Sequence, residues 1–183
     1  MGGYLKMGKN IVILSGSPRK GGNTEKLILA FKEGAESAGN IVAVFHTAYM
    51  SIKGCIGCEF CTAHEGECTL SDDMGIILDA MNKCDVIIWA SPIYYFSFTA
   101  QLKTVIDRTY PFVNKDKKQA GLMLTFAYDK DDTAVGAIAI YERILRYYEW
   151  EDAFRLFVPS VEHVNDIDGR PELDLARKLG KEI

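Results

Sequence analysis

The chain has 183 residues, of which 48% are hydrophobic and 25% are charged, a composition typical of one soluble globular domain rather than of a disordered segment. The formal net charge is −4 and no basic run occurs, so we expect no nucleic-acid partner, which would need clustered Lys and Arg. No apolar stretch approaches the roughly 18–20 residues that span a bilayer, so we expect no membrane association.

The first segment, residues 1–9, contains no apolar stretch long enough for a signal peptide. We therefore expect a flexible N-terminal extension on a cytoplasmic protein. Thiols stay reduced in that compartment, so closely spaced cysteines there indicate metal, cluster or redox chemistry more than structural disulfides.

From residue 10 onward, strand-like and helix-like segments alternate along the chain. Strands are predicted over residues 11–14, 41–45, 86–89, 121–126 and 154–158, and helices over residues 24–38, 72–83, 100–110, 134–149 and 172–181. Most strand segments are continuously apolar, as expected for a parallel sheet that is buried on both faces. The alternation predicts an α/β fold, a flavodoxin-like three-layer sandwich with a five-stranded parallel sheet of order 2-1-3-4-5. No long linker divides the chain, so we expect a single domain.

A glycine-rich loop follows the first predicted strand. Residues 15–24 read Ser-Gly-Ser-Pro-Arg-Lys-Gly-Gly-Asn-Thr and precede a predicted helix. Backbone N–H groups, the Arg19 cation and the positive end of the helix dipole would form an anion site at the carboxyl end of the strand. The alternative is a plain turn with Asn23 or Thr24 as helix N-cap. The spacing fits neither a nucleotide P-loop nor the Gly-x-Gly-x-x-Gly dinucleotide fingerprint, so we expect no tightly held NAD.

Four of the five cysteines lie in the longest irregular stretch, residues 47–70. Four neighbouring thiolates are the usual ligands of a [4Fe–4S] cluster. Zinc is a second interpretation, although zinc sites usually combine two separated cysteine pairs. Thiols without metal, in a structural or substrate-gating loop, are the third. The motif is Cys55-x2-Cys58-x2-Cys61-x6-Cys68.

Three motifs together resemble the NAD(P)H-dependent FMN reductase family, whose members have the flavodoxin-like fold. Residues 15–24 resemble the FMN phosphate loop of that family, and residues 91–96 resemble its second flavin loop. The cysteine motif, followed by Asp72 and Asp73, resembles the iron-sulfur flavoprotein branch. The resemblance covers roughly residues 10–126 and places the motifs in the right order.

The resemblance implies a single FMN-binding domain with NAD(P)H as a transient co-substrate. The cofactor-binding residues that it implies are Ser15, Ser17, Arg19, Asn23, Thr24, Pro92, Ile93, Tyr94, Tyr95, Phe96, Thr125 and Ala127. The metal ligands that the iron-sulfur branch implies are Cys55, Cys58, Cys61 and Cys68. The aromatic residues follow an apolar strand near the switch point of the sheet, where they can face a flavin and exclude water. A core or interface role is the alternative for each of them.

These motifs predict an FMN-dependent oxidoreductase that passes electrons from NAD(P)H through bound FMN to a small-molecule acceptor. No catalytic side chain is assigned, because the flavin would carry the redox chemistry. One alternative is an FMN/[4Fe–4S] electron-transfer flavoprotein reduced by a ferredoxin-type donor, and another is a zinc-stapled, anion-binding interaction protein. We expect a homodimer or homotetramer, because in this fold a second subunit often closes the flavin face that one subunit leaves open.

Overall fold

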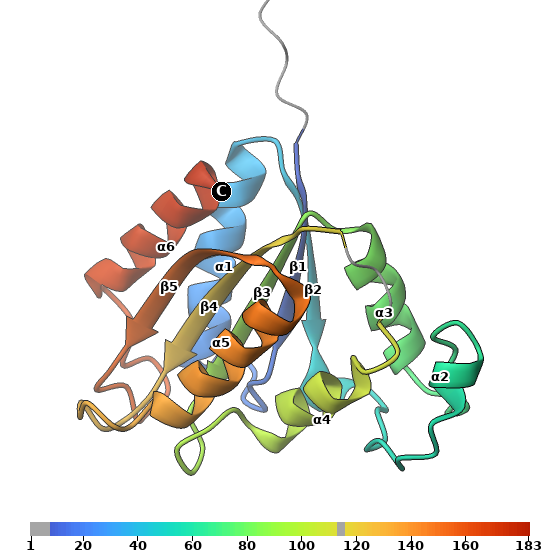
Figure 1. Cartoon of the computed structure of the whole chain (residues 1–183). Coiled ribbons are helices and arrows are strands. Elements are labelled where there is room, and N and C mark those ends of the chain that lie inside the picture. Colours follow the sequence, from blue (N-terminus) through green and yellow to red (C-terminus); the bar gives the residue numbers. More distant parts are fainter. Residues whose placement is uncertain (1–7, 113–115) are drawn as a thin grey trace, which may run out of the picture.

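The computed structural model describes residues 8–112 and 116–183. They form a five-stranded parallel sheet of order β2-β1-β3-β4-β5 with helices on both faces (Figure 1). This architecture confirms the predicted flavodoxin-like α/β fold. The strands are β1 Asn10–Ser15, β2 Ile41–His46, β3 Val86–Pro92, β4 Gln119–Thr125 and β5 Glu151–Val158. The helices are α1 Asn23–Ser37, α2 Phe60–Ala63, α3 Met74–Lys83, α4 Ala100–Arg108, α5 Val135–Tyr148 and α6 Pro171–Glu182, with a 3-10 turn η1 Thr47–Tyr49.

The predicted strands and the five predicted helices agree with this assignment, apart from small shifts at their ends. Two short elements, η1 and α2, lie inside the stretch that the sequence predicts to be irregular. They have three and four residues, too few to produce a hydrophobic periodicity. Within the described ranges, no helix has both the length and the apolar character needed to cross a membrane.

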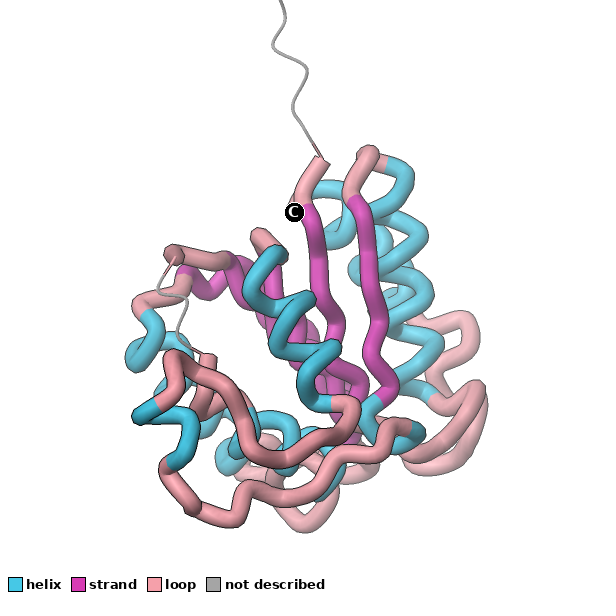
Figure 2. Tube along the Cα trace, turned by 90° about the vertical axis from the view of Figure 1, so that its right-hand side faces the viewer, coloured by secondary structure: helices cyan, strands magenta, loops and turns pink. Residues whose placement is uncertain are grey.

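The central strands β1, β3 and β4 are almost wholly buried because helices cover both faces of the sheet, whereas the edge strands β2 and β5 also carry exposed residues. Along β1, Ile11 and Ile13 belong to the apolar core that also contains residues of α1 and α6, whereas Val12 and Leu14 belong to the core that also contains residues of α3, α4 and α5. Figure 2 shows helices on both sides of the strands. The sheet therefore separates two apolar cores and is the rigid support for the loops at its carboxyl edge.

The strand order reverses between β1 and β3, because β1 pairs with β2 on one side and with β3 on the other. The helix after β1 covers one face of the sheet, and the helix after β3 covers the opposite face. Loops that leave a parallel sheet toward opposite faces open a crevice at the carboxyl ends of the strands. The glycine-rich loop lies at this point.

The predicted N-terminal extension, residues 1–9, lies mostly outside the described residues. Lys9 is described, and its backbone N–H donates to Asn40 Oδ1 at 2.9 Å. The Lys9 ammonium donates to Gln119 Oε1 at 2.6 Å and to the carbonyl of Ile183. The end of α6 therefore lies beside the entry into β1, as Figure 1 shows.

Candidate functional site

A pocket of about 150 Å³ lies at the carboxyl edge of the sheet, beside the glycine-rich loop, and we call it the phosphate-loop pocket. Its walls come from the loops after β1, β3, β4 and β5. The predicted cofactor-binding residues that line it are Ser17, Arg19, Asn23, Thr24, Pro92, Ile93, Tyr94, Thr125 and Ala127. The structure therefore brings together the phosphate loop, the second flavin loop and the residues Thr125 and Ala127, which the resemblance assigns to one cofactor.

Gly16 is required for the close approach of this loop to the start of α4. Its N–H donates to the Ala90 carbonyl at 2.8 Å, and its own carbonyl accepts from the Thr99 hydroxyl at 2.8 Å. A Cβ atom at position 16 would lie 2.7 Å from Thr99 Oγ1 and 2.8 Å from Leu102 Cβ. Only glycine fits without displacing α4.

The donors of the phosphate-loop pocket suit an anion. Gly22 is the N-cap of α1 and supplies no side-chain cap, so the first backbone N–H groups of the helix are suited to bind an anion. The N–H of Gly21 donates to the Glu25 carboxylate at 2.6 Å, which shows that the loop already directs a donor toward negative charge. The buried Thr24 hydroxyl lies 2.7 Å from the Thr125 hydroxyl, which links α1 to the end of β4. These residues fit the phosphate of FMN.

The loop after β5 forms a wall of the pocket that the sequence analysis missed. Val161 and Glu162 line the pocket. The Asn23 amide donates to the His163 carbonyl at 2.8 Å, and Arg19 donates to the Glu162 carbonyl at 3.0 Å. No local motif marks this loop, because its role depends on contacts with residues about 140 positions earlier in the chain.

Three predicted cofactor-binding residues do not line this pocket. Ser15 is fully buried, and its hydroxyl has no hydrogen-bond partner within the described part of the chain. Tyr95 and Phe96 are 97% and 58% exposed and occupy a tight turn closed by hydrogen bonds between Tyr94 and Ser97. Both have positive φ, which costs a residue other than glycine about 1–2 kcal/mol. A strained turn thus holds two aromatic side chains in solvent next to the pocket.

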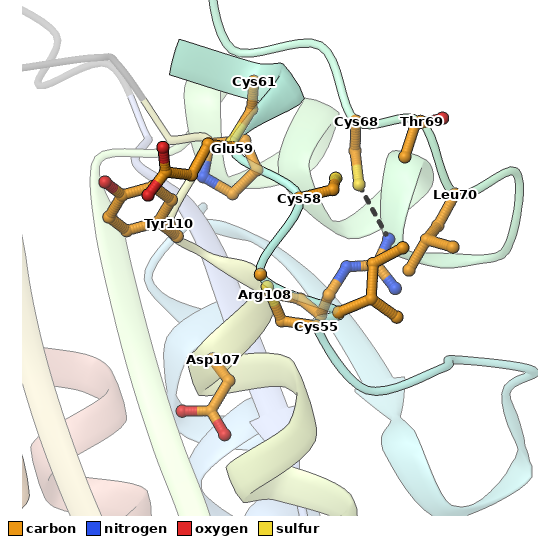
Figure 3. Close-up of a pocket in the computed structure, with 13 residues that line it drawn as sticks. Cys55, Cys58, Glu59, Cys61, Cys68, Thr69, Leu70, Asp107, Arg108 and Tyr110 are labelled. Carbon is orange, nitrogen blue, oxygen red and sulfur yellow. Dashed lines mark hydrogen bonds between the residues drawn. The ribbon is translucent and has the colours of Figure 1, made fainter.

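All four clustered cysteines line a second pocket of about 310 Å³, which we call the cysteine pocket (Figure 3). Cys55 and Cys58 are exposed, while Cys61 and Cys68 are half-buried. Gly57 adopts a positive φ of 64°, which turns the chain between the first two cysteines. The predicted ligands therefore surround one cavity, and cluster ligation stays a prediction.

The four cysteines line a cavity and do not converge on the position of a single ion. In residues 8–112 and 116–183, no three His, Cys, Asp or Glu side chains converge closely enough to hold a single metal ion. In Figure 3, Cys61 lies beside Glu59, whereas Cys68 lies beside Arg108. Thiolates around a wide cavity suit a multi-iron cluster better than zinc, whose bonds to sulfur are only about 2.3 Å long.

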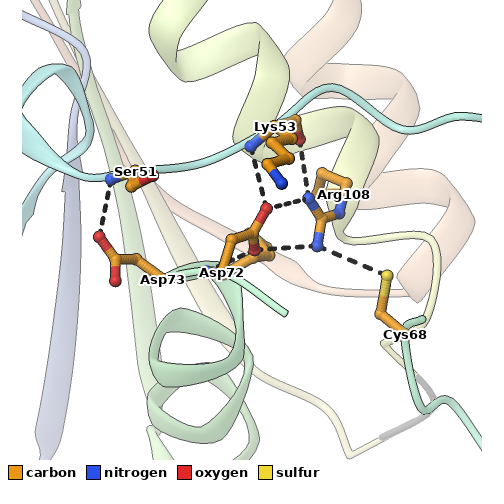
Figure 4. Close-up of polar contacts among 7 residues, drawn as sticks. Ser51, Lys53, Cys68, Asp72, Asp73 and Arg108 are labelled. Atoms are coloured by element: carbon orange, nitrogen blue, oxygen red, sulfur yellow. Dashed lines mark hydrogen bonds and ion pairs between the residues drawn. The ribbon is translucent and has the colours of Figure 1, made fainter. Parts of the chain in front are cut away.

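A buried ion pair borders the cysteine pocket. The Arg108 guanidinium lies 2.8 Å from the Asp72 carboxylate, and each side chain is only 2% exposed. Arg108 also donates to the Lys53 carbonyl at 2.7 Å and to Cys68 Sγ at 3.5 Å (Figure 4). Burial alone would lower the pKa of Arg108, but the hydrogen bonds and charge of Asp72 raise it, so the guanidinium stays charged. No local pattern in the sequence indicates this pair, because its members lie 36 positions apart.

The two aspartates at the start of α3 anchor the entry into the cysteine loop. Asp73 accepts from the Ser51 N–H at 2.7 Å, and Asp72 accepts from the Lys53 N–H at 3.0 Å (Figure 4). Asp72 also accepts from the Met74 N–H at 3.1 Å, as an acidic residue at a helix N-terminus commonly does. These bonds fix the chain just before Cys55.

Comparison with known proteins assigns the chain to a family. The family model described as NADPH-dependent FMN reductase matches residues 9–131, which include both flavin-type loops and the cysteine motif. The chain belongs to the NADPH-dependent FMN reductase family. This assignment confirms the resemblance inferred from the motifs and the expected class, a flavin-dependent oxidoreductase.

The curated relatives of this chain include several iron-sulfur flavoproteins. One from Archaeoglobus fulgidus is 38% identical over 115 residues, which are 61% of this chain and 52% of the relative. One from Methanosarcina thermophila is 38% identical over 96 residues, which are 52% of this chain and 50% of the relative. The chain spans about half the length of the curated relatives that it matches.

Solved structures with the same fold include a quinone oxidoreductase and an azoreductase. An NAD(P)H:quinone oxidoreductase from Methanothermobacter marburgensis superposes with a TM-score of 0.71 at 16% identity and covers 96% of each chain. An azoreductase from Bacillus anthracis superposes with a TM-score of 0.73 at 13% identity, covering 96% of this chain and 100% of that one. At such low identity these similarities establish the fold alone.

Proposed function

We propose that this protein is an electron-transfer oxidoreductase that binds FMN in the phosphate-loop pocket and a [4Fe–4S] cluster in the cysteine pocket. The observation that carries the proposal is that all four cysteines of the motif line one cavity in a chain with an FMN-type phosphate loop. The iron-sulfur flavoproteins among its relatives support the same pairing of cofactors.

In this proposal, the phosphate-loop pocket holds the phosphate end of FMN. Arg19 supplies the positive charge, and the backbone and side chains of Asn23 and Thr24 supply neutral donors at the start of α1. The loops after β3 and β4 lie on the side where the ring system would extend, with Tyr94 on the wall. When bound, FMN supplies the redox chemistry by accepting electrons from a donor and passing them to an acceptor.

The proposal includes a second copy of the chain. The phosphate-loop pocket has about 150 Å³, whereas pockets for whole cofactors have about 300–1,000 Å³. One chain therefore encloses only part of the flavin. Tyr95 and Phe96, which the turn after β3 holds in solvent, are suited to cover the ring from a neighbouring subunit. We expect a homodimer or homotetramer.

Two kinds of electron donor are compatible with these sites. The chain lacks a dinucleotide fingerprint, so NAD(P)H would stack on the flavin and leave before the acceptor enters, which gives ping-pong kinetics. The second candidate is a ferredoxin-type protein, and the exposure of Cys55 and Cys58 favours it, because a cluster held there would lie near the surface. If NAD(P)H is the donor, a small molecule would accept the electrons from the flavin.

The visible spectrum of protein purified without air tests the two cofactors. We expect flavin bands on a broad iron-sulfur absorbance, with about four iron and four sulfide per chain. Cys68→Ser should lose most of the iron and keep the flavin. Cys84→Ala is the matched control, because Cys84 is buried in the apolar core away from the cysteine pocket and its loss should leave the iron content unchanged. Flavin without iron in the wild type would contradict the cluster, and a colourless protein would contradict both cofactors.

Initial-rate measurements identify the donor. Parallel double-reciprocal lines with NAD(P)H and a quinone or nitro acceptor are expected for the ping-pong route. Intersecting lines would contradict that route. Negligible NAD(P)H oxidation together with rapid reduction by a reduced ferredoxin would select the protein donor.

A further inference from the structure

Arg108 is the one cation among the described residues that line the cysteine pocket. The acidic residues Glu59 and Asp107 also line this cavity, and the Asp107 carboxylate is paired with Lys103 at 2.6 Å. A cluster bound by four thiolates is itself negatively charged. Arg108 is therefore the positive charge that the described lining of the pocket offers to a bound cluster.

The Arg108 side chain is held in place rather than mobile. Two hydrogen bonds to the Asp72 carboxylate, at 2.8 and 3.1 Å, and one to the Lys53 carbonyl, at 2.7 Å, fix the guanidinium. Its Nη2 also donates to Cys68 Sγ at 3.5 Å. Within the described chain, the buried Nε has no hydrogen-bond partner. Figure 4 shows Arg108 between Asp72 and Cys68, with the cation directed at the sulfur.

Resting on the cluster that the proposed function places here, we propose that Arg108 is a positioning residue that sets the reduction potential of this centre. It orients the Cys68 sulfur through a charge-assisted N–H···S hydrogen bond and places a fixed positive charge beside the cluster. Reduction adds an electron to the centre, so a buried cation next to it favours the reduced state, as hydrogen bonds to cluster sulfurs also do.

Asp72 has the opposite electrostatic effect in this arrangement. Its carboxylate holds Arg108 in position, but its negative charge offsets part of the guanidinium charge that the cluster experiences. Neutralising Asp72 should therefore favour reduction, whereas neutralising Arg108 should disfavour it. A role in folding alone predicts no such opposition of sign, because both substitutions break the same buried pair.

The test compares midpoint potentials of the cluster in the full chain, loaded anaerobically with FMN, iron and sulfide. We expect Arg108→Gln to lower the equilibrium constant for cluster reduction about tenfold, a shift of about 59 mV for a one-electron couple. Asp72→Asn should shift the potential upward. The double variant Asp72→Asn/Arg108→Gln leaves no uncompensated buried charge and should shift the potential downward by less than Arg108→Gln, because the cation lies nearer the sulfur.

Arg155→Gln is the matched control, because Arg155 is also paired with two carboxylates but contacts neither pocket. Its potential should equal that of the wild type. The role of Arg108 would be overturned if the loaded variants had the wild-type potential, or if Arg108→Gln and Asp72→Asn shifted it in the same direction. Neither result would contradict the presence of the cluster. If a single variant fails to fold, the midpoint potential of the double variant is the test. A downward shift supports the role of Arg108, and an unchanged potential contradicts it. A wild-type chain that takes up no iron and sulfide would refute the cluster, and with it this role.

Discussion

At the residue scale, the phosphate-loop pocket depends on the Arg19 cation, which the loop after β5 holds in place. Arg19 precedes α1 by four positions, and its guanidinium donates to the Glu162 carbonyl in the loop after β5. The contact directs the side chain across the pocket, where it can form charge-assisted hydrogen bonds with a phosphate. Its neighbour Lys20 instead lies over the ring of Tyr49.

Arg19→Ala should therefore weaken the retention of FMN. Hydrogen bonds to charged groups contribute about 1.5–3 kcal/mol, so the dissociation constant should rise about 10- to 100-fold. Fluorescence titration of FMN measures this change. Lys20→Ala is the control and should bind FMN like the wild type. Equal affinities for all three proteins would remove Arg19 from the phosphate site.

The buried ion pair also predicts a pH dependence of stability. Burial would raise the pKa of Asp72, but hydrogen bonds from Arg108, Lys53 and Met74 lower it below its ordinary value of 3.8. Because the folded-state pKa lies below the unfolded value, the ionised carboxylate stabilises the fold fully above about pH 4. That contribution is lost as the pH falls through the folded-state pKa.

Urea unfolding of the wild type and Asp72→Asn tests this dependence. At neutral pH the variant should be less stable by about 3–5 kcal/mol, because Arg108 is left as an uncompensated buried charge. The difference should shrink as the pH falls below the ordinary aspartate value of 3.8 and through the lowered folded-state pKa, where the wild-type carboxyl also becomes protonated. A difference that stays constant across this range would show that Asp72 acts through packing and not through its charge.

At the element scale, α1 and α6 pack closely because glycines lie at their contact. A Cβ atom at Gly34 on α1 would lie 1.9 Å from the Arg177 carbonyl oxygen on α6. A Cβ atom at Gly180 on α6 would lie 2.1 Å from the Phe31 carbonyl oxygen on α1. The two backbones thus approach each other at distances that no side chain permits. Since α1 also carries Asn23 and Thr24, this packing fixes one wall of the phosphate-loop pocket.

Gly34→Ala should separate α6 from α1 and lower the free energy of unfolding by about 1–3 kcal/mol or more, as overpacked sites do. Gly75→Ala on α3 is the matched control, because a Cβ atom there meets nothing within 4 Å. It should leave stability unchanged or raise it by up to about 1 kcal/mol. Equal urea midpoints for Gly34→Ala and the wild type would contradict the close packing.

A single helix connects the two pockets. The N-cap of α4, Thr99, donates to the Gly16 carbonyl in the phosphate loop, and the last residue of α4 is Arg108 in the cysteine pocket. Nine residues of α-helix extend about 13 Å. The separation of the two pockets is therefore set by a rigid element, and the aromatic turn after β3 lies just before its start.

At the scale of the whole molecule, the exposed aromatic turn and the small phosphate-loop pocket predict self-association. Sedimentation at working concentration should show a dimer or tetramer. Replacing both Tyr95 and Phe96 with Ser should shift the protein toward the monomer and reduce FMN retention, because the ring would lose its cover. Leu29→Ser, which removes an exposed apolar side chain from α1, should change neither property. A wild type that sediments as a monomer would refute the assembly.

The sequence by itself determined the fold and the two motifs around which the pockets form. Short apolar runs alternate with amphipathic segments, and hydrophobic periodicity acts within a few residues, so the strands and helices could be predicted. The order β2-β1-β3-β4-β5 followed from the match of this alternation to the flavodoxin-like fold. The phosphate loop and the cysteine motif could also be predicted, because neighbouring residues in the sequence supply their functional groups. The family match confirms the resemblance that these motifs carry.

Only the tertiary structure decided which distant residues complete the two pockets. The pairing of Asp72 with Arg108, and the closure of Asn23 and Arg19 by the loop after β5, depend on the path of the chain. The tertiary structure also decides that Tyr95 and Phe96 are exposed, because the sequence around an aromatic residue does not show whether it lies in a core or in solvent. Burial and charge pairing are properties of the packed molecule, so they became visible only when the strands and helices were placed in space.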